Sequence, residues 1–423
     1  MILNDRQKLI VNGGRRLEGE LRVHGAKNSA LPLLSAAVLA HGETVLHNCP
    51  MLTDVDAACR ILSHIGCKCR RSADTVTVDA ANVFGSEIPD NLMREMRSSI
   101  VFLGAMLGRM GRCKLSFPGG CELGARPIDL HISALRQMGA EIGEQHGFLE
   151  CSAPRGLHGA KLVLSFPSVG ATENILLAAV TAKGETEIHN AAREPEIVDL
   201  ADFLTKCGAR IKGAGESVII IDGVPRLEPC EHSVIPDRIA AGTYLCAAAI
   251  THGELILTNC RPEHMTGFLQ VLEAMGARIY TYGGGKMYFT GKKRLSASPT
   301  IRTMPYPGFP TDIQAPFTAL CSTANGTSVF VETIFENRFR HIPELVRLGA
   351  SVKTEGRVCV VEGVRQLSGA KVCAAELRGG AALVTAALAA EGTSEIGGLQ
   401  FIDRGYESLE NALRSIGADV RRI

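Results

Sequence analysis

The sequence contains a pattern of about 70 residues that recurs six times along the chain. In every repeat an apolar residue, a glycine and a small residue end an amphipathic segment, and successive marker glycines lie 73, 69, 68, 73 and 68 residues apart. A second glycine series precedes the first by 23 to 28 residues. Two markers in one phase indicate a repeat architecture in which each repeat is one supersecondary unit. The marker glycines are Gly66, Gly139, Gly208, Gly276, Gly349 and Gly417, and the earlier series is Gly42, Gly111, Gly184, Gly253, Gly326 and Gly392.

Each repeat combines two kinds of helix with short strands. The first helix, for example 239–250, is apolar on all sides, which predicts that it is buried. A strand such as 44–47 follows, then an amphipathic helix such as 54–65. Two alternating strands, such as 210–212 and 218–221, close the repeat. The pattern of one repeat is βαβαββ, and it predicts an α/β fold made of α+β repeats.

The two ends of the chain predict how the repeats are grouped. The sixth repeat ends after a single closing strand, 419–422, whereas the N-terminus carries an unassigned strand at 8–11. We expect the N-terminal strand to complete the sixth repeat, so that the chain crosses twice between two three-repeat domains. The break falls in the proline-rich segment 225–236. The predicted domains are residues 25–235, of N-terminal type, and residues 1–24 plus 236–423, of C-terminal type.

The composition limits the class of partner. Hydrophobic residues make up 46% of the 423 residues and charged residues 21%, which is typical of a folded globular protein. The 45 basic and 44 acidic residues leave a net charge of +1, so we expect neither nucleic acid nor a membrane surface as a partner. An anionic ligand would have to be held by cations clustered in one place.

The lack of a recognisable signal peptide, together with the many cysteines, predicts a cytoplasmic location. The N-terminus lacks the apolar run of a signal peptide, and the longest uncharged stretch, 313–331, is interrupted by polar residues, so no membrane insertion is expected. The 14 cysteines therefore indicate free thiols in a reducing compartment. No Cys-x-x-Cys motif occurs, and Cys67 and Cys69 have the spacing of a strand, so we expect no metal.

Two classes of function fit a repeat protein at this point. A passive binding array keeps its loops equivalent, whereas an enzyme with its site in the interdomain cleft breaks the symmetry in a few loops. The longest deviating loop, in the second repeat, contains Pro118-Gly119-Gly120-Cys121 and then Arg126. Such a turn exposes backbone N–H groups to an anion, and a thiol near an arginine is reactive. A chance cysteine in a surface loop is the alternative.

Residues at the starts of the buried helices form a second group of candidates. Lys27 begins the first such helix, where the helix dipole disfavours a cation unless an anion is shared; a solvated turn lysine is the alternative. Asp312 begins the helix of the fifth repeat, either as a charge that complements the dipole or as a general base. Ser168 opens the helix of the third repeat with small residues that suit a diphosphate but also cap ordinary helices.

These positions fall at the same end of their repeats, and pseudo-symmetry directs them toward the interdomain cleft. Arg404 lies in the sixth-repeat loop equivalent to the loop of Cys121. A cleft that collects these cations would bind a small, multiply anionic ligand rather than nucleic acid. The cations are Lys27, Arg97, Arg126, Arg378 and Arg404.

Six ordered motifs resemble the UDP-N-acetylglucosamine 1-carboxyvinyltransferases, the enolpyruvyl transferases that open bacterial peptidoglycan synthesis. The resemblance covers essentially the whole chain. The motifs are Gly25-Ala26-Lys27-Asn28 and residues 118–131, 192–197, 309–314, 335–339 and 403–407.

The resemblance implies a fold and a reaction. The fold is a two-domain inside-out α/β barrel with three βαβαββ repeats in each domain and a double crossover between them. In the reaction, the 3′-hydroxyl of UDP-N-acetylglucosamine attacks C2 of phosphoenolpyruvate, C3 is protonated, and phosphate leaves a tetrahedral intermediate. No metal or other cofactor is implied, and the oligomeric state is left open.

The resemblance also assigns roles to individual residues. Lys27, Arg126 and Arg404 grip phosphoenolpyruvate, Cys121 is the general acid and the target of the epoxide fosfomycin, and Asp312 is the base. The catalytic set is Lys27, Cys121, Asp312 and Arg404. The further substrate-binding residues are Asn28, Arg97, Arg126, Pro127, Ile128, Asp129, Leu130, Phe166, Ser168, Val169, Gly170, Ile334, Glu376 and Arg378.

The chain departs from the family pattern at three places. Glu376 stands where the family usually has Asp, and Val101 stands where some members carry an aromatic residue. Phe166-Pro167 replaces a Lys-Val pair, which removes a cation near the diphosphate. Two alternatives remain: an inactive relative, and a shikimate-type enolpyruvyl transferase, which shares the sixfold architecture but lacks the Gly-Gly-Cys loop.

Overall fold

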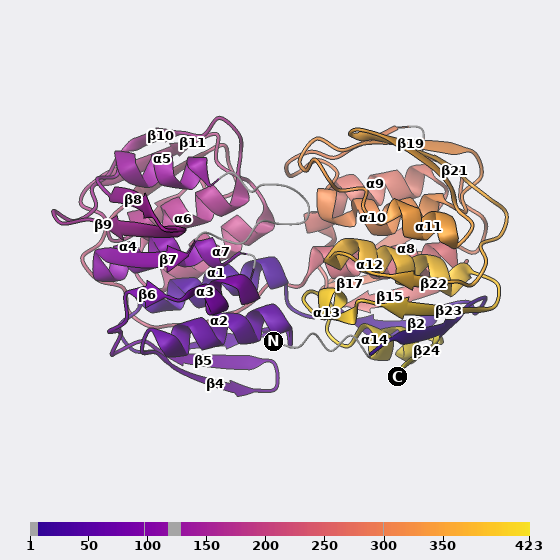
Figure 1. The fold of residues 1–423 in the computed structure, drawn as a ribbon, viewed down its shortest axis with the longest axis horizontal. Coiled ribbons are helices and arrows are strands. Elements are labelled where there is room, and N and C mark those ends of the chain that lie inside the picture. Colours follow the sequence, from indigo (N-terminus) through magenta and orange to yellow (C-terminus); the bar gives the residue numbers. More distant parts are fainter. Residues whose placement is uncertain (1–6, 97, 117–127, 299) are drawn as a thin grey trace. The chain divides into compact units, whose positions relative to one another are not determined.

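The computed structural model describes residues 7–96, 98–116, 128–298 and 300–423. The chain divides into two compact units (Figure 1). One, which we call the N-terminal unit, contains the described residues from Gly25 to Ile235. The other, the C-terminal unit, contains the residues up to His24 together with Pro236–Ile423.

The described residues form six four-stranded sheets with one common topology, three in each unit. In every sheet the first two strands are parallel and the other neighbours are antiparallel. In the N-terminal unit the strands, in sheet order, are β14 (Glu231–Ser233), β3 (Glu43–His47), β5 (Thr75–Asp79) and β4 (Lys68–Ser72); β6 (Glu87–Ile88), β7 (Arg112–Ser116), β9 (Phe148–Ser152) and β8 (Glu141–Gln145); and β10 (Lys161–Val163), β11 (Glu185–His189), β13 (Val218–Asp222) and β12 (Arg210–Lys212).

The three sheets of the C-terminal unit follow the same order. They are β2 (Glu18–Arg22), β15 (Glu254–Thr258), β17 (Lys286–Thr290) and β16 (Arg278–Tyr282); β18 (Thr300–Arg302), β19 (Thr327–Val331), β21 (Val358–Glu362) and β20 (Ser351–Glu355); and β22 (Lys371–Cys373), β23 (Thr393–Gly397), β1 (Leu9–Asn12) and β24 (Asp419–Arg422).

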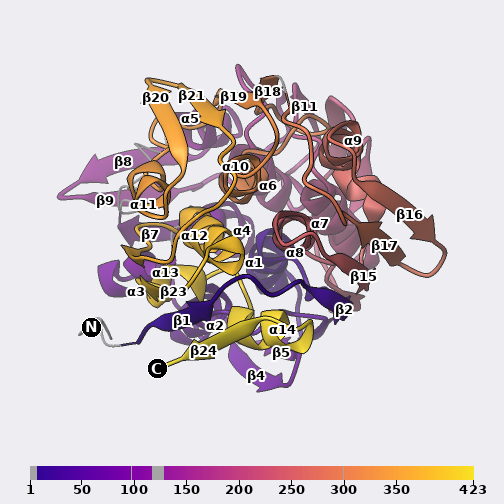
Figure 2. The same ribbon diagram turned by 90° about the vertical axis from the view of Figure 1, so that its right-hand side faces the viewer.

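The N-terminal strand completes the sixth repeat, as the sequence predicts. Strand β1 lies between β23 and β24 and is antiparallel to both, with Leu9 opposite Ile396 on one side and Arg422 on the other. Figure 2 shows indigo β1 beside yellow β24. The first and last strands of the chain therefore belong to one sheet.

Two short strands pair with strands of a different repeat, and one of them corrects the sequence interpretation. Strand β2 pairs in parallel with β15, and β14 pairs in parallel with β3. Strand β14 lies inside the segment 225–236 that was expected to be a break without regular structure. Its three residues, Glu231, His232 and Ser233, alternate exposed, buried and exposed. Three polar residues are too few to produce a visible apolar period, so the pattern missed the strand.

Each unit encloses three buried helices, as the apolar segments predict. Figure 2 shows those of the C-terminal unit, α8, α10 and α12, near the centre of the sheets. The buried helices are α1 (Lys27–Ala36), continued by the 3-10 turn η1 (Ala37–Leu39), α4 (Phe102–Met110), α6 (Val169–Ala179), α8 (Arg238–Ile250), α10 (Thr311–Cys321) and α12 (Leu377–Ala389).

The amphipathic helices follow the strands of each repeat and end at the marker glycines. All six marker glycines have positive φ, between 92° and 107°. A left-handed residue commonly ends a helix, which explains why glycine recurs there. The amphipathic helices are α2 (Thr53–His64), α5 (Asp129–Gln137), α7 (Pro195–Lys206), α9 (Thr266–Ala274), α11 (Ile342–Arg347) and α14 (Leu409–Ser415); the remaining short ones are α3 (Asp90–Glu95), α13 (Leu399–Ile402), η2 (Ser99–Val101) and η3 (Pro262–Met265).

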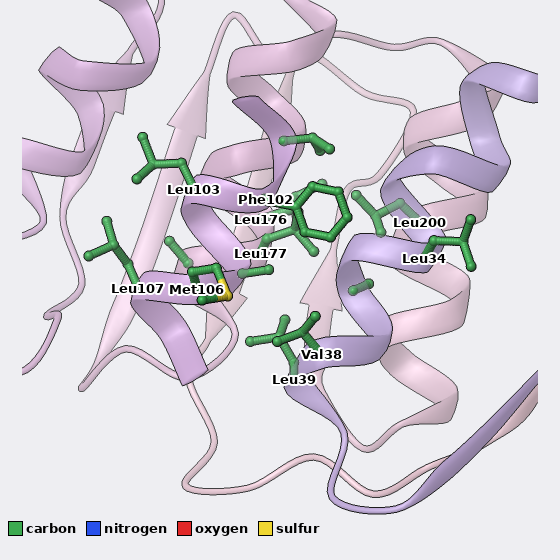
Figure 3. Packing of buried hydrophobic residues seen from close by; sticks show 14 of the residues in the cluster. Leu34, Val38, Leu39, Phe102, Leu103, Met106, Leu107, Leu176, Leu177 and Leu200 are labelled. Carbon is green, nitrogen blue, oxygen red and sulfur yellow. The ribbon is translucent and has the colours of Figure 1, made fainter. Parts of the chain in front are cut away.

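The core of the N-terminal unit is formed where its buried helices meet. Figure 3 shows Phe102 and Met106 of α4 beside Leu176 of α6. Gly104 allows this close approach, because a Cβ there would lie 2.2 Å from the carbonyl oxygen of Asn174. The helix starts that carry the candidate residues are therefore set by rigid, tightly packed elements.

Candidate active site

Asp312 of the C-terminal unit is held by two buried arginines. It lies in the first turn of α10, as predicted, and its side chain is 26% exposed. Nη2 of Arg338 donates to Oδ1 at 2.8 Å, and Nη2 of Arg378 donates to Oδ2 at 3.1 Å. Each carboxylate oxygen of Asp312 is therefore oriented by a charged guanidinium group. A carboxylate that only complemented the helix dipole would not need two buried arginine partners.

The guanidinium group of Arg378 packs against an aromatic ring. Its guanidinium lies 5.5 Å from the centre of the Tyr406 ring, and the Tyr406 hydroxyl forms a 2.8 Å hydrogen bond with the hydroxyl of Thr243 on α8. Burial is the largest single influence on Arg378 and lowers its pKa, but Asp312, Tyr406 and Asp237 together outweigh burial, so the pKa of Arg378 is raised. Arg378 therefore stays cationic, with its orientation fixed by Asp312 of α10 and by the Tyr406 ring.

A buried glutamate fixes the start of α10 to the loop after β19. Glu332 is 1% exposed. Its Oε2 accepts from the hydroxyl of Thr311 at 3.0 Å, and its Oε1 accepts from the backbone N–H of Ile334 at 2.8 Å. The half-buried Ile334, a predicted sugar-nucleotide contact, is thereby held at a fixed position relative to Asp312.

Glu376 caps its own helix. It is the N-cap of α12, and its carboxylate accepts from the backbone N–H of Arg378 at 2.9 Å and from that of Gly379. It is only 2% exposed, so the partner of this carboxylate, which the sequence left undetermined, is the helix end. The buried His341 lies nearby, and burial lowers its pKa to about 4 against the opposing effect of Glu376.

Arg404 follows α13 in a loop with fixed neighbours. Asp403, on one side, accepts hydrogen bonds from Arg422, and Tyr406, on the other, is 1% exposed. Arg404 itself is half-buried. It lies in the loop of the sixth repeat that joins α13 to α14.

In the N-terminal unit, Lys27 is buried and forms an ion pair. It is the first residue of α1 and is 8% exposed, which excludes the solvated turn lysine considered above. Its Nζ lies 2.6 Å from Oδ2 of Asp54, which is in the first turn of α2 and 1% exposed. Asp54 therefore supplies an anion that Lys27 shares with the start of α1. Asn28 follows Lys27 in α1 and is half-buried.

The start of α6 has the capped form predicted for the third repeat. Ser168 is the N-cap, and its hydroxyl accepts from the N–H of Ala171 at 3.3 Å. Val169 and Gly170 occupy the first turn and are partly accessible, and Phe166 is 41% exposed. A partly accessible first turn retains free capacity for an anion, but the cap is equally that of an ordinary helix.

The start of α5 is fixed by a buried polar network. Ile128 is its buried N-cap, and Asp129 and Leu130 lie in its first turn. Nδ1 of His131 lies 2.7 Å from the side-chain nitrogen of Asn174, which also donates to the carbonyl of Ile100 at 3.0 Å. The three predicted contact residues at this helix start therefore sit on a rigid base.

Four predicted residues lie outside the described residues. They are Arg97, Cys121, Arg126 and Pro127. The structure therefore locates one set of candidates on α1, α5 and α6 and the loop before α6, and a second set on α10, α12 and the loops after β19 and α13.

Several residues of these clusters were missed from sequence. Arg338 and Tyr406 stood inside motifs of the resemblance without an assigned role, whereas Asp54 and Glu332 carried no signal. The available clue was a charged residue at the start of an otherwise apolar helix, because such a charge needs a partner. Sequence does not reveal which distant residue supplies it.

Among the described residues, no group of three or more His, Cys, Asp or Glu side chains is arranged to hold a metal ion. None of the helices within these ranges has the length and apolar character needed to cross a membrane.

Comparison with known proteins identifies the class of protein to which this fold belongs. Residues 11–413 match the family described as EPSP synthase (3-phosphoshikimate 1-carboxyvinyltransferase). The structure resembles the enolpyruvyl transferase NikO from Streptomyces tendae, with a TM-score of 0.88, 26% identity and 98% coverage of both chains. It also shares its fold with an EPSP synthase from Acinetobacter baumannii, with a TM-score of 0.76, 18% identity and 99% coverage of both chains. The fold is that of the two-domain enolpyruvyl transferases, as predicted.

Sequence relatives narrow the class. UDP-N-acetylglucosamine 1-carboxyvinyltransferase 2 from Caldanaerobacter subterraneus subsp. tengcongensis is 54% identical, over 98% of this chain and 99% of its own. UDP-N-acetylglucosamine 1-carboxyvinyltransferase 1 from Symbiobacterium thermophilum is 50% identical, over 100% and 96%. The chain belongs to the UDP-N-acetylglucosamine 1-carboxyvinyltransferase family of transferases.

Proposed function

We propose that the chain transfers the enolpyruvyl group of phosphoenolpyruvate to the 3′-hydroxyl of UDP-N-acetylglucosamine and releases phosphate, the first committed step of peptidoglycan synthesis. The observation that carries this proposal is the 54% identity, over nearly the full length of both chains, to a relative named for that activity. Among the described residues, the arrangement around Asp312 supports it.

Asp312 is assigned as the base. The sugar hydroxyl is a weak nucleophile, so its proton must be accepted as its oxygen bonds to C2 of phosphoenolpyruvate. The Asp312 carboxylate is partly accessible, and Arg338 and Arg378 fix its orientation. Its negative charge also opposes the positive charge that develops at C2 when C3 is protonated.

The anionic groups of phosphoenolpyruvate are assigned to Lys27, Arg126 and Arg404. Arginine binds phosphate and carboxylate bidentately through its planar fork, whereas lysine acts as a point charge. Lys27 already pairs with Asp54, which holds its ammonium group in place. Residues of both units are assigned to the reaction in this proposal.

Cys121 is assigned as the general acid that protonates C3. Addition forms the bond from the sugar oxygen to C2 and gives a tetrahedral phospholactoyl intermediate. Elimination then breaks the bond from C2 to the phosphate oxygen, and C3 loses a proton to restore the double bond. No step requires a redox cofactor or a metal.

The nucleotide is assigned to the remaining candidates. The starts of α5 and α6 offer backbone N–H groups that suit a diphosphate. Because Phe166 and Pro167 supply no charge, the start of α6 takes a larger share of diphosphate binding in this proposal. Both substrates are cytoplasmic metabolites, so we place the protein in the cytoplasm.

The deciding experiment measures phosphate release from phosphoenolpyruvate with the purified full chain. We expect release that depends on UDP-N-acetylglucosamine and a product heavier by one enolpyruvyl group. Shikimate 3-phosphate serves as the competing acceptor. Release with that acceptor instead would assign the chain to the shikimate-type enzymes, and release with neither would indicate an inactive relative.

A further inference from the structure

We propose that Arg422, next to the C-terminal residue, is a positioning residue that orients Arg404 for the anion of phosphoenolpyruvate. The inference rests on the proposed function, which assigns Arg404 to that anion. Arg422 acts through Asp403, the residue that directly precedes Arg404 in the chain.

Arg422 holds Asp403 through a two-pronged contact. Nη1 of Arg422 donates to Oδ2 of Asp403 at 2.9 Å, and Nη2 donates to Oδ1 at 2.6 Å. The side chains of Arg422 and Asp403 are 24% and 27% exposed. A planar fork matched to a carboxylate fixes direction as well as distance, which a lysine cannot do.

A second carboxylate fixes the arginine. Nε of Arg422 donates to Oε1 of Glu410 at 2.9 Å, and Nη2 donates to Oε2 at 3.1 Å. Glu410 is in α14 and its side chain is 9% exposed. Arg422 therefore bridges the loop before α14 and α14 itself, with little freedom to adopt another rotamer.

The other side of Arg404 is equally constrained. Gly405 packs on α12 so closely that a Cβ there would lie 2.7 Å from a methyl carbon of Leu377. Tyr406 is buried, and its hydroxyl is hydrogen-bonded to Thr243. The backbone of Arg404 is thus held between a clamped Asp403 and a packed Gly405 and Tyr406.

This arrangement exceeds what the fold alone requires. Strand β24 is already fixed by its antiparallel pairing with β1, and α14 is covered by the core through Leu409 and Leu413. The Arg422 side chain adds a contact to Asp403, the loop residue that directly precedes Arg404. A half-buried arginine whose backbone is fixed loses less conformational entropy when it binds an anion.

The test compares Arg422→Met, Arg422→Lys and Asp403→Asn in the full chain. For Arg422→Met we expect KM for phosphoenolpyruvate to rise about tenfold, because a displaced anion-binding group costs this much or more. KM for UDP-N-acetylglucosamine should change by less than about twofold. Arg422→Lys should give an intermediate value. Arg421→Met, at the exposed neighbouring position on β24, is the matched control and should match the parent protein.

A binding readout separates this inference from the proposed function. Protection against thermal unfolding is measured at increasing phosphoenolpyruvate concentration, without an acceptor. We expect Arg422→Met to need about tenfold more phosphoenolpyruvate for half of the protection, for the same reason. If the parent binds phosphoenolpyruvate but turns over neither acceptor, the proposed function fails and this readout still tests Arg422. Unchanged phosphoenolpyruvate dependence in Arg422→Met, or equal weakening for both substrates, would overturn the inference.

Discussion

Nη2 of Arg338 donates to Oδ1 of Asp312 at 2.8 Å, and only 2% of the Arg338 side chain is exposed. The same arginine donates to the carbonyl oxygen of Thr311 at 3.1 Å and stacks 5.4 Å from the ring of Phe335. It is thus tied to both the side chain of Asp312 and the backbone that carries it. A buried guanidinium in this position fixes the direction of the carboxylate and balances its charge.

We predict that Arg338→Met lowers turnover more than it lowers substrate binding. Asp312 would lose the guanidinium that holds its Oδ1, and we expect its carboxylate to rotate away from the sugar hydroxyl. A loss of about 100-fold in kcat is expected, because a displacement of about 1 Å at a reacting group has that effect. Steady-state kinetics with both substrates measures it.

Two variants control for the Arg338 result. Asp312→Asn removes the proposed base and should lose at least as much kcat as Arg338→Met. Arg357→Met breaks an exposed pair, 3.3 Å from Glu336, and should leave the kinetics unchanged. If Arg338→Met keeps the parent's kcat while Asp312→Asn loses it, Arg338 has no positioning role.

Asp54 should be essential for stability, and Lys27 for activity. Asp54→Asn leaves the buried Lys27 ammonium without its charged partner, and breaking such a pair costs about 3 kcal/mol of unfolding free energy. Combining it with Lys27→Met removes both charges and should restore much of the stability without restoring turnover. Denaturant unfolding and phosphate release are measured on the single variants and the combination. Recovery of turnover in the double variant would show that Lys27 only balances Asp54.

Acid should destabilise the C-terminal unit through His341. Burial lowers its pKa to about 4 in the folded protein, against 6.5 in an unfolded chain, so the unfolded state binds more protons between these values. Stability is therefore complete above pH 6.5 and is lost as the pH falls toward 4, by about 2 kcal/mol at pH 5. His341→Gln should remove this part of the loss. Denaturant unfolding at pH 7.5 and pH 5 measures it.

The exposed His64 at the end of α2 provides the control for His341. His64→Gln should keep the full acid sensitivity of the parent. An equal loss of stability in His341→Gln and the parent between the two pH values would mean that the acid sensitivity arises elsewhere.

The sequence predicted the repeats well because local physics determines them. A glycine that must adopt positive φ after each amphipathic helix recurs at Gly66, Gly139 and the four later markers, and its spacing located all six repeats. Strand β1 was predictable because its apolar alternation had no partner in its own repeat. Strand β14 was not, because three polar residues show no period.

The charge partners of the candidate site were beyond sequence reasoning. Lys27 and Asp54 lie 27 positions apart on different helices, and Asp312 is paired with residues 26 and 66 positions away. Sequence marks a charge at a buried helix start as needing a partner, but tertiary packing selects which one. The same holds for Glu376, whose carboxylate turned back to cap its own helix rather than facing another residue.

Fosfomycin should label Cys121 and no other cysteine. Thiolates, not thiols, open an epoxide, and burial raises the pKa of Cys67 and Cys321 to about 12 and that of Cys151 to about 11. The cations proposed around Cys121 would instead favour its thiolate and bind the phosphonate of the reagent. Peptide mapping by mass spectrometry after treatment identifies the labelled residue.

Three described cysteines have a feature that could make them react with fosfomycin, and they are therefore internal controls for the labelling test. Cys373 is exposed, and hydrogen bonds from neighbouring thiols lower the pKa of Cys69 and Cys230. None of these three belongs to the proposed anion site, so exposure or a lowered pKa alone should not suffice. Cys373→Ser should keep one label per chain, whereas Cys121→Ser should lose the label together with most turnover near neutral pH, because a hydroxyl is a weaker acid than a thiol. A label on Cys373, or full activity in Cys121→Ser, would remove Cys121 from its assigned role.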